Sequence, residues 1–426
     1  MKIHFIGIGG IGMSAVAQFF LSENHEISGS DLAPSKVTDL LISKGAKIFF
    51  EHDANNLPDD AGLVVYTTAV DPKNPELKKA TGLNIQTISY AEALGVISEG
   101  KFTIAVAGTH GKTTTTAMIA KIMFDAGLDP TVIAGSIMTD FGSNFVLGKS
   151  QYFLVEACEY RRTFLNLEPN ILVITNIEED HLDYYKDLKD IQSAFLQLAK
   201  KLKKEDFLIC NIEHPNLEPI IGNKKIECNI IDYHSLVSAE PSLKVPGEHN
   251  KENAKAALAV SAVFEVDEKK AVKSLEEFRG TWRRMERRGE TKKGAVLFDD
   301  YAHHPSEIKA SLSSLFGMFP DKKIVIAFQP HLYSRTKSFL KEFGESFQGV
   351  EEVITAPIYA AREEDDGTIS HKILAEEIKK TGIQAEARNS FEEIAEYIRE
   401  NFDSDYIVVT MGAGDIYKVG EIVLKN

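Results

Sequence analysis

The sequence predicts an α/β protein of three domains, each built on a mostly parallel sheet. The chain has 426 residues, more than one hydrophobic core usually serves, so two or three domains are expected. Short apolar runs alternate along the chain with stretches of helical periodicity, which is the pattern of parallel α/β sheets. The alternation falls into three blocks, and we place the domain boundaries at 1–99, 100–281 and 282–426.

The composition is that of a soluble globular protein, with 43% hydrophobic and 26% charged residues. No apolar run approaches the about 20 residues that cross a bilayer, and no signal peptide precedes the first strand-like run, so we expect no membrane insertion. The net charge of −15 argues against nucleic acid as a partner. Cys158, Cys210 and Cys228 lack the C-x-x-C spacing, and we interpret them as buried thiols of a protein in the reducing cytoplasm.

The first block opens with KIHFIGIG and continues with LVVYTTA at 63–69. Gly7, Gly9 and Gly12 fit the pattern G-x-G-x-x-G directly after a strand-like run. Asp31 ends the next such run, HEISGSD, where an acid that binds a ribose is expected. Backbone N–H groups of such a loop can bind a diphosphate at a helix N-terminus. The block is therefore predicted to be a Rossmann-like domain.

The glycine motif alone leaves three interpretations open. An NAD-dependent dehydrogenase uses such a loop, and a nucleotide sugar offers a diphosphate equally well. A tight turn without a ligand is the third interpretation, and the three glycines with Asp31 argue against it.

The second block contains FTIAVAG, YFLVEA, NILVITN and DFLICN, and closes with a helical pattern from His249 to about Phe264. The segment AGTHGKTTTT follows its first apolar run, with Lys112 between a glycine and Thr113. A phosphate loop needs that lysine for the β- and γ-phosphates and that hydroxyl for Mg²⁺. Val106 stands where the common G-x-x-x-x-G-K-[ST] loop has glycine, so this is a tighter variant. Four threonines could also be a mere helix start, but the preceding glycine and lysine favour a central P-loop-type ATPase domain.

An ATP site also predicts metal ligands at strand ends of the same sheet. Glu156 ends YFLVEA, and His181 lies in TNIEEDHLDYY, shortly after another apolar run. A carboxylate suits Mg²⁺, whereas an imidazole is an unusual ligand for so hard an ion. On this chemistry alone His181 is better explained as a structural or water-bound residue.

The third block begins near the basic segment WRRMERRGE, which we interpret as a connector. The apolar runs AVLFDDY, KKIVIAFQ, EEVITA and YIVVTMGAGD follow it and predict a C-terminal Rossmann-like α/β domain.

Several motifs resemble, in this order, those of the Mur ligases, the ATP-dependent enzymes that build the peptide of peptidoglycan precursors. They are GIGGIGMS, AGTHGKTTT, EACEYRRTFL with TNIEEDHLDYY, PGEHNKENAKAALAV, RRME with DDYAHHPSEI, and FQPHLYSRT. The resemblance covers essentially the whole chain. It is closest to the members that join L-alanine to UDP-N-acetylmuramate, in a shorter style with EACEY where others read EADES.

The resemblance implies that the first domain binds UDP-N-acetylmuramate. The residues implied are Gly7, Gly9, Gly10, Gly12, Met13, Ser14, Asp31, Thr67 and Thr68. In the second domain it implies ATP, with magnesium held by Thr113, Glu156 and His181. The ATP contacts implied are Gly108, Thr109, His110, Gly111, Lys112, Thr113, Thr114, Asn250 and Asn253, completed by Arg284 and Asp300 from the third domain.

Tyr301, His303 and Arg335 match positions that the family associates with the incoming alanine. Leu332 stands where an arginine is common in the family, which leaves Arg335 as the candidate for binding the alanine carboxylate. The catalytic residues implied are Lys112, His181, Arg284, Asp300 and His303.

The reaction implied is ATP-dependent activation of a carboxylate to an acyl phosphate, followed by attack of the alanine amine. We expect the third domain to close on the others, and the protein to be a monomer or a homodimer. A tripeptide ligase of murein recycling shares the first two domains, and FQPHLYSRT favours the alanine enzyme over it. An NAD dehydrogenase has no use for the second loop. A non-catalytic nucleotide-binding module is disfavoured because the metal, base and amino-acid positions are all filled.

Overall fold

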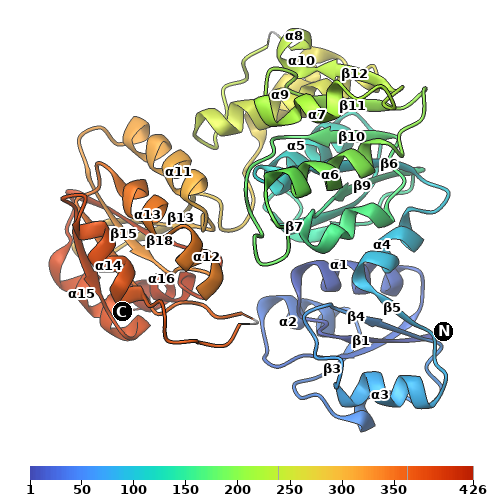
Figure 1. Cartoon of the computed structure of the whole chain (residues 1–426), viewed down its shortest axis with the longest axis horizontal. Helices are drawn as coiled ribbons and strands as arrows, with labels where there is room; N and C mark the ends of the chain where they lie inside the picture. The colour runs from blue at the N-terminus through green and yellow to red at the C-terminus, as the bar shows by residue number, and fades with distance from the viewer. Residues whose placement is uncertain (238, 362, 426) are drawn as a thin grey trace. The chain divides into compact units, whose positions relative to one another are not determined.

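The computed structural model describes every residue except 238, 362 and 426, and its strands form three sheets (Figure 1). The chain divides into two compact units. The first comprises Met1–Asp180, Tyr184–Ser242 and Glu252–Phe278, and the second comprises His181–Asp183, Leu243–Lys251 and Arg279–Asn426. Three mainly parallel sheets with connecting helices confirm the predicted fold class, while the predicted domain boundaries stay predictions.

The first sheet has the strand order β3-β2-β1-β4-β5, and all of its pairs are parallel. Its strands are β1 (Lys2–Ile6), β2 (Glu26–Ser30), β3 (Lys47–Phe49), β4 (Leu63–Tyr66) and β5 (Thr87–Ser89). The helices between them are α1 (Ile11–Ser22), α2 (Lys36–Ser43), η1 (Ala54–Asn56), α3 (Pro75–Gly82) and α4 (Tyr90–Ser98). The strand order reverses between β1 and β4, and in open α/β sheets ligands bind at the carboxyl ends of the strands beside such a reversal.

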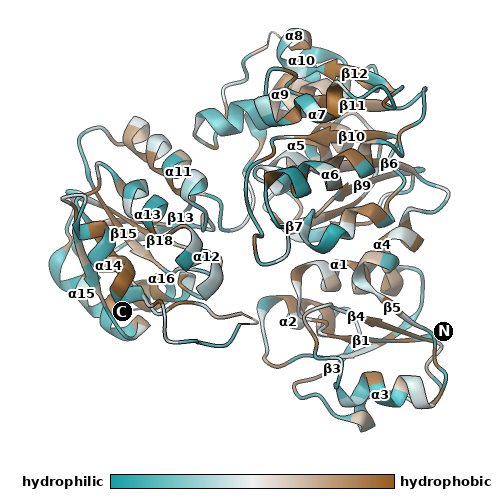
Figure 2. Ribbon diagram, in the orientation of Figure 1, coloured by the Kyte–Doolittle hydropathy of each residue, from teal (hydrophilic) through white to brown (hydrophobic). Residues whose placement is uncertain are grey.

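The second sheet has the order β12-β11-β10-β6-β9-β7-β8, with one antiparallel pair, β7 and β8. Its strands are β6 (Phe102–Ala107), β7 (Thr131–Met138), β8 (Ser143–Val146), β9 (Tyr152–Glu156), β10 (Ile171–Ile174), β11 (Phe207–Cys210) and β12 (Asn229–Asp232). The helices of this region are α5 (Lys112–Asp125), η2 (Tyr160–Asn166), α6 (Leu188–Ala199), η3 (Pro215–Leu217), α7 (Glu218–Ile221), α8 (Tyr233–Leu236), α9 (Glu248–Val263) and α10 (Glu268–Glu277). The inner strands are the apolar runs of the sequence, and they are coloured mainly as hydrophobic in Figure 2.

The β7–β8 hairpin joins the first two sheets into one packed unit, because it lies against α1 of the first sheet. Asn144 of β8 donates from Nδ2 to the carbonyl of Ile11 at 2.5 Å and accepts from Gln18 Nε2 at 3.1 Å. The ring of Phe145 meets Phe19 edge-on at 6.4 Å. The helix that follows the first glycine loop is therefore fixed by the domain that carries the second loop.

The third sheet has the order β13-β14-β18-β15-β16-β17. Its strands are β13 (Glu286–Glu290), β14 (Val296–Asp300), β15 (Lys323–Phe328), β16 (Glu352–Thr355), β17 (Gln384–Ala387) and β18 (Tyr406–Met411). The helices are α11 (Pro305–Met318), α12 (Tyr333–Ser338), α13 (Leu340–Gly344), η4 (Glu345–Phe347), α14 (His371–Lys379), α15 (Phe391–Asn401) and α16 (Tyr417–Leu424).

Strand β13 corrects one sequence prediction, because it consists of ERRGE from the segment that we interpreted as a connector. It is antiparallel to β14 and forms an edge of the sheet, with no fully buried residue. Charged side chains are common on edge strands, where they discourage pairing with other chains. The charge that suggested a connector is therefore compatible with a strand at this position.

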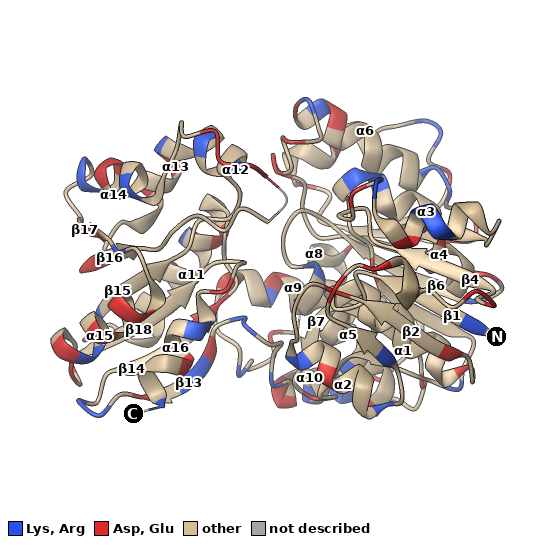
Figure 3. Ribbon diagram, turned by 90° about the horizontal axis from the view of Figure 1, so that it is seen from below, with Lys and Arg blue, Asp and Glu red and all other residues tan. Residues whose placement is uncertain are grey.

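Side-chain caps fix several helix starts. Ser89 and Glu92 form a capping box at α4. Asp187 and Ser390 are simple N-caps of α6 and α15, each accepting from a backbone N–H of the first turn. Acidic and basic side chains are mixed on exposed helices such as α10 and α14 (Figure 3). Among the described residues, no helix is long and apolar enough to cross a membrane.

The three cysteines are free thiols. Cys210 is buried as predicted, but Cys158 and Cys228 are only half-buried, so the prediction of three buried thiols is wrong for these two.

Candidate functional site

The first glycine loop follows β1 at the reversal of the first sheet. Gly7 has φ +80°, and a Cβ at this position would lie 2.5 Å from Thr67 Cγ2. A Cβ on Gly12 would lie 2.6 Å from the Tyr90 hydroxyl. Both positions therefore require glycine, one for conformation and space and the other for space alone. The structure brings Thr67, which follows β4, against Gly7 of this loop, while the predicted binding of a substrate by Thr67 and Thr68 stays a prediction.

Asp31 lies against this loop and stabilises it. Its carboxylate accepts from the N–H of Gly9 at 2.7 Å and from the N–H of Leu32 at 2.7 Å. One of the amides that we expected to face a diphosphate is thus bonded to Asp31. The predicted contact of Asp31 with a ribose stays a prediction, and the structure adds a second role as a brace of the loop.

Met13 and Ser14 lie in the first turns of α1 and are buried. The Ser14 hydroxyl donates to the carbonyl of Ile11 at 2.7 Å and accepts from Asn144 Nδ2 at 3.1 Å. Their side chains therefore stabilise the helix and its contact with the β7–β8 hairpin. Their predicted part in substrate binding, like that of Gly10, stays a prediction.

The second glycine loop connects β6 to α5. Gly108 has φ +136° and Gly111 has φ +83°, and a Cβ on Gly108 would lie 2.0 Å from Thr175 Oγ1. The segment after β10 holds the loop in place: Thr109 N–H donates to the carbonyl of Asn176 at 3.1 Å, and His110 N–H donates to Asn176 Oδ1 at 2.9 Å. Bonds to the backbone and side chain of Asn176 therefore fix the conformation of the loop. Asn176 was not among the residues selected from the sequence.

Lys112 is the first residue of α5, and its side chain curls back over the loop. Its ammonium donates to the carbonyls of Gly108 at 2.5 Å and Thr109 at 2.9 Å, and lies 2.9 Å from Glu159 Oε2. Burial by itself lowers the pKa of Lys112, but the negative charges around it, chiefly Glu159, raise the pKa above its usual value. Lys112 is therefore a cation held inside a phosphate-type loop.

The carboxylate of Glu156 lies at the end of β9, beside the start of α5. It accepts from the Thr113 hydroxyl at 3.1 Å and from the N–H of Gly135 at 2.5 Å. Two of the three predicted magnesium ligands are thus in contact. The third, His181, has φ +54° in the segment after β10, and its role as a ligand stays a prediction. Oxygen donors of this kind suit a hard cation such as Mg²⁺.

The adenine-binding prediction rests on α9. Asn253 accepts from the Thr115 hydroxyl at 3.1 Å, and its Oδ1 would lie 2.4 Å from a Cβ on Gly111, so it borders the loop. Asn250 Nδ2 donates to the carbonyl of Pro246 at 2.6 Å. Thr114 lies buried in the first turn of α5. The structure thus places Asn253 and Thr114 at the loop, while their contacts with a nucleotide remain predictions.

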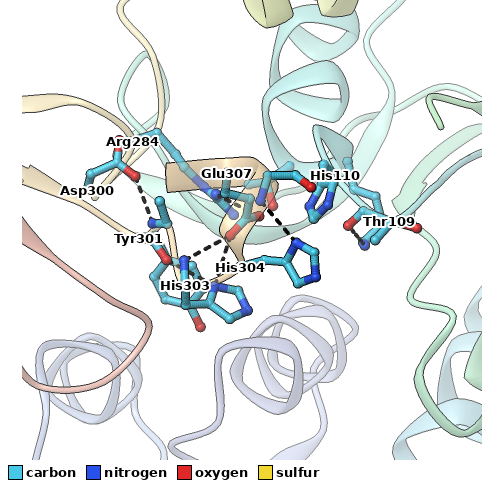
Figure 4. Close-up of polar contacts among 12 residues, drawn as sticks. Thr109, His110, Arg284, Asp300, Tyr301, His303, His304 and Glu307 are labelled. Carbon is cyan, nitrogen blue, oxygen red and sulfur yellow. Dashed lines mark hydrogen bonds and ion pairs between the residues drawn. The ribbon is translucent and has the colours of Figure 1, made fainter. Parts of the chain in front are cut away.

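In the second unit, Asp300 ends β14 and is 3% exposed. Its carboxylate accepts from the N–H groups of Met285 at 3.0 Å and Ala302 at 2.7 Å (Figure 4). Burial raises the pKa of Asp300 to about 6, against the nearby positive charge of Arg284, which lowers it. Asp300 is therefore a buried carboxyl group whose pKa lies above its usual value.

The two arginines of the RRME motif have different environments. Arg283 is buried and donates to Asp299 at 2.8 Å and to the carbonyls of Gly412 and Gly414, so it holds β14 to the loop after β18. Arg284 is about a third exposed, with its guanidinium 5.0 Å from the Tyr301 ring centre. Arg284 Nη1 also lies 3.8 Å from Glu307 Oε1, so it is less buried and less tightly bonded than Arg283, and its role at a ligand stays a prediction.

The predicted alanine-binding residues gather on one side of the third sheet. His303 Nδ1 lies 3.1 Å from the Tyr301 carbonyl and 3.2 Å from Glu307 Oε2 (Figure 4). Its ring meets His331 edge-on at 5.6 Å, and His331 Nδ1 accepts from Arg335 at 3.1 Å. From the sequence, His331 is interpreted as an ordinary packed or capping histidine, yet it lies between His303 and Arg335. Its position in FQPHLYSRT was the signal that could have identified it.

Models of three protein-family domains match successive parts of the chain. The first, described as "Mur ligase family, catalytic domain", matches 2–102, and the second, "Mur ligase middle domain", matches 106–240. The third, "Mur ligase, glutamate ligase domain", matches 283–414. The chain belongs to the Mur ligase family. The resemblance inferred from the motifs is confirmed.

Full-length Mur ligases are similar to this chain. A UDP-N-acetylmuramate–L-alanine ligase of Clostridium kluyveri is 42% identical over 100% of this chain and 98% of its own length, and so is one of Clostridium tetani. The crystal structure of a UDP-N-acetylmuramate-alanine ligase from Thermotoga maritima matches with a TM-score of 0.84 and 30% identity, over 100% of this chain and 98% of its own. A murein peptide ligase from Psychrobacter arcticus, at 23% identity, shares the fold with a TM-score of 0.76 over 100% of this chain and 98% of its own.

Proposed function

We propose that this chain is an ATP-dependent ligase that joins L-alanine to the lactyl carboxylate of UDP-N-acetylmuramate. The products are UDP-N-acetylmuramoyl-L-alanine, ADP and phosphate, which makes the reaction a step of peptidoglycan precursor synthesis. The observation that carries the proposal is the presence of two glycine loops in one packed unit, of which only the second has a lysine. The full-length relatives that bear this activity in their name support it.

The two loops have different tasks in this proposal. The first loop, with Thr67 and Thr68, binds the diphosphate of the sugar nucleotide, and the second binds the phosphates of ATP. A free carboxylate is a poor acyl donor, so the γ-phosphoryl group is transferred to it to form an acyl phosphate. Lys112 neutralises charge that develops on the phosphoryl oxygens in that step. Magnesium, for which Thr113 and Glu156 provide suitable oxygen donors, would supply further positive charge there.

The second step is attack of the alanine amine on the acyl phosphate, with loss of phosphate and of one proton. Both neighbours of His303 Nδ1, the Tyr301 carbonyl and the Glu307 carboxylate, are acceptors. The proton of a neutral His303 therefore belongs on Nδ1, which leaves Nε2 free to accept a proton from the amine. Arg335 holds the alanine carboxylate in this scheme, since a guanidinium matches a carboxylate with two parallel hydrogen bonds.

Arg284 and Asp300 complete the ATP site in this proposal. Arg284 supplies positive charge to the phosphates from the exposed side of the RRME turn. We further propose a cytoplasmic location and a monomeric or homodimeric state.

Two neighbouring activities are the alternatives. A tripeptide ligase of murein recycling would use the same sugar nucleotide, and the description of the third family model names glutamate rather than alanine. The test is phosphate release and product mass with UDP-N-acetylmuramate, ATP and one acceptor at a time: L-alanine, glycine, L-serine, D-glutamate or the recycled tripeptide. We expect efficient release with L-alanine and a product heavier by one alanine residue. Preferred use of the tripeptide or of glutamate would contradict the proposal.

A further inference from the structure

The turn between β9 and β10 contains two consecutive residues in the left-handed region. Arg161 has φ 51° and ψ 27°, and Arg162 has φ 56° and ψ 27°. A side chain other than glycine is strained in this region. Such conformations persist only where the surroundings enforce them, and they are concentrated at functional sites. The turn therefore raises the question of what it positions.

Arg162 is the residue that anchors the turn. Its NH2 group donates to Asp190 Oδ1 at 2.6 Å, and its guanidinium lies 5.4 Å from the ring centre of Tyr185, a residue 2% exposed. The backbone N–H of Arg162 donates to the carbonyl of Glu159 at 2.9 Å, and the Tyr185 hydroxyl donates to the same carbonyl. These contacts fix the backbone, and Arg162 acts as a structural residue.

Arg161 is the residue that the turn presents. Its side chain is exposed, and its NH1 group donates to the carbonyl of Thr68 at 3.3 Å. Thr68 follows Thr67, whose Cγ2 leaves no room for a side chain at Gly7. The guanidinium therefore reaches across from the second sheet to the edge of the first sheet where the first glycine loop lies.

A diphosphate bound at the first loop would lie near the negative charge of Asp31, and Arg161 could supply a positive charge there. A sugar-nucleotide diphosphate carries two negative charges, and the carboxylate of Asp31 is bonded directly to the N–H of Gly9 in the loop. Lys112 is bonded to Glu159 and to the second loop. A guanidinium binds phosphate oxygens with paired hydrogen bonds and retains its charge at all relevant pH values.

We propose that Arg161 binds the diphosphate of the sugar nucleotide and sets the affinity of the first loop for it. The inference rests on the proposed function and names a contact that the glycine motif does not contain. On binding, the guanidinium exchanges its single bond with the Thr68 carbonyl for bonds to phosphate oxygens. In this proposal the strained turn places the Arg161 guanidinium beside the first loop, which has no cation of its own.

The test compares Arg161→Met and Arg161→Lys with a matched control, Lys224→Met, which removes an exposed positive charge of the same unit. Binding is measured by calorimetry with UDP-N-acetylmuramate, and with UDP and UDP-N-acetylglucosamine, which carry the diphosphate but no lactyl carboxylate. For Arg161→Met we expect all three ligands to bind about tenfold to a hundredfold more weakly, the loss typical of a charge-assisted hydrogen bond. Arg161→Lys should recover part of the loss, and the control should bind as the wild type does.

Steady-state kinetics adds a second readout. In Arg161→Met the KM for UDP-N-acetylmuramate should rise while the KM values for ATP and alanine stay within about twofold, because a local contact is lost. Unchanged binding of all three ligands would overturn the inference. A loss confined to UDP-N-acetylmuramate would also overturn it, since the contact would then be with the lactyl carboxylate. An equal loss for every substrate, together with a lower melting temperature, would show a structural role instead.

Failure of this inference is distinct from failure of the proposed function. If the wild-type protein does not form the alanine product, the proposed function fails. If the wild type is active and Arg161→Met binds the diphosphate ligands normally, only the assignment of Arg161 fails.

Discussion

The candidate sites of the first unit of this Mur ligase are formed mainly by backbone groups, and those of the second unit mainly by side chains. In the first unit the sites are mainly backbone, with glycines at Gly7, Gly108 and Gly111 where a Cβ would clash. In the second unit they are side chains, among them His303 and Arg335. Phosphates offer many oxygens and accept from any suitably placed N–H, whereas a small amino acid must be recognised by a few directional groups. The backbone sites suit nucleotides, and the side-chain site suits alanine.

The two units also place their charges differently. In the first unit the ammonium of Lys112 lies within the second loop, close to the Glu159 carboxylate. The two arginines of RRME differ in environment: Arg283 is buried and bonded to Asp299, whereas Arg284 is about a third exposed. If this comparison is correct, substitutions in the glycine loops of the first unit should affect the nucleotides, and substitution of Arg335 in the second unit should affect alanine.

The largest expected effect is that of Lys112→Met. The substitution keeps the length of the side chain and removes the charge that, in the proposed function, neutralises the phosphoryl oxygens. We expect kcat to fall about a thousandfold, at the upper end of what the loss of one electrostatic donor costs. Phosphate release is the measurement, and Lys121→Met, further along α5 and paired with Asp125 on the surface, is the control. Near-normal release by folded Lys112→Met would contradict the ATP assignment.

The next effect is expected for Gly9→Val. A Cβ on Gly9 would lie 2.8 Å from Asp31 Oδ2, so the substitution displaces the carboxylate that braces the loop. We expect UDP-N-acetylmuramate to bind about a hundredfold more weakly, as for the loss of two hydrogen bonds, with ATP binding retained. Calorimetry with each ligand measures this. The control is Gly82→Ala, where an added Cβ meets nothing within 4 Å. An equal loss of ATP binding would show that the two loops are not separate sites.

A smaller effect is expected for Arg335→Lys in the second unit. A lysine keeps the charge but cannot form two parallel bonds with a carboxylate. The KM for alanine should rise about tenfold to thirtyfold, with little change for ATP or the sugar nucleotide. Kinetics with each substrate varied in turn provides the measurement, and Arg287→Lys, which is 56% exposed, is the control. An unchanged KM for alanine with normal turnover would show that Arg335 does not bind the alanine carboxylate.

The smallest effect concerns Asp300, whose pKa is raised from 3.8 to about 6. An acid with a raised pKa binds its proton more tightly in the folded state, so it stabilises the fold at low pH. That contribution is lost as the pH rises from about 4 to about 6, at up to about 1.4 kcal/mol per pH unit. In Asp300→Asn the melting temperature should depend less on pH in this window. Calorimetric melting of both proteins across the window measures it, and parallel curves would contradict the raised pKa.

Much of the fold could be predicted from the sequence because its inner strands are continuous apolar runs. β1, β6, β14 and β18 lie where such runs were recognised. Strand β13 could not be recognised, because an edge strand buries too little surface to require apolar residues. The β7–β8 hairpin was also missed. It packs against α1 beside the first sheet, and a contact between residues so distant in sequence leaves no local pattern.

The site could be predicted only where a residue type is demanded by chemistry. Lys112 and Glu156 carry such a demand, and the structure puts each beside its loop. Asn176 and His331 were missed because they act through the geometry of their neighbours. The left-handed turn at Arg161 was invisible for the same reason, since the contacts that enforce it come from residues distant in sequence.

Cys158 lies between two site carboxylates in the EACEY segment, and its half-buried thiol has a consequence for oxidative chemistry. Burial, together with the negative charge of Glu159, raises the pKa of this thiol to about 12. Only the thiolate reacts readily with peroxides and alkylating reagents, and the raised pKa keeps this thiol protonated at neutral pH. The cysteine between Glu156 and Glu159 should therefore resist oxidation at neutral pH.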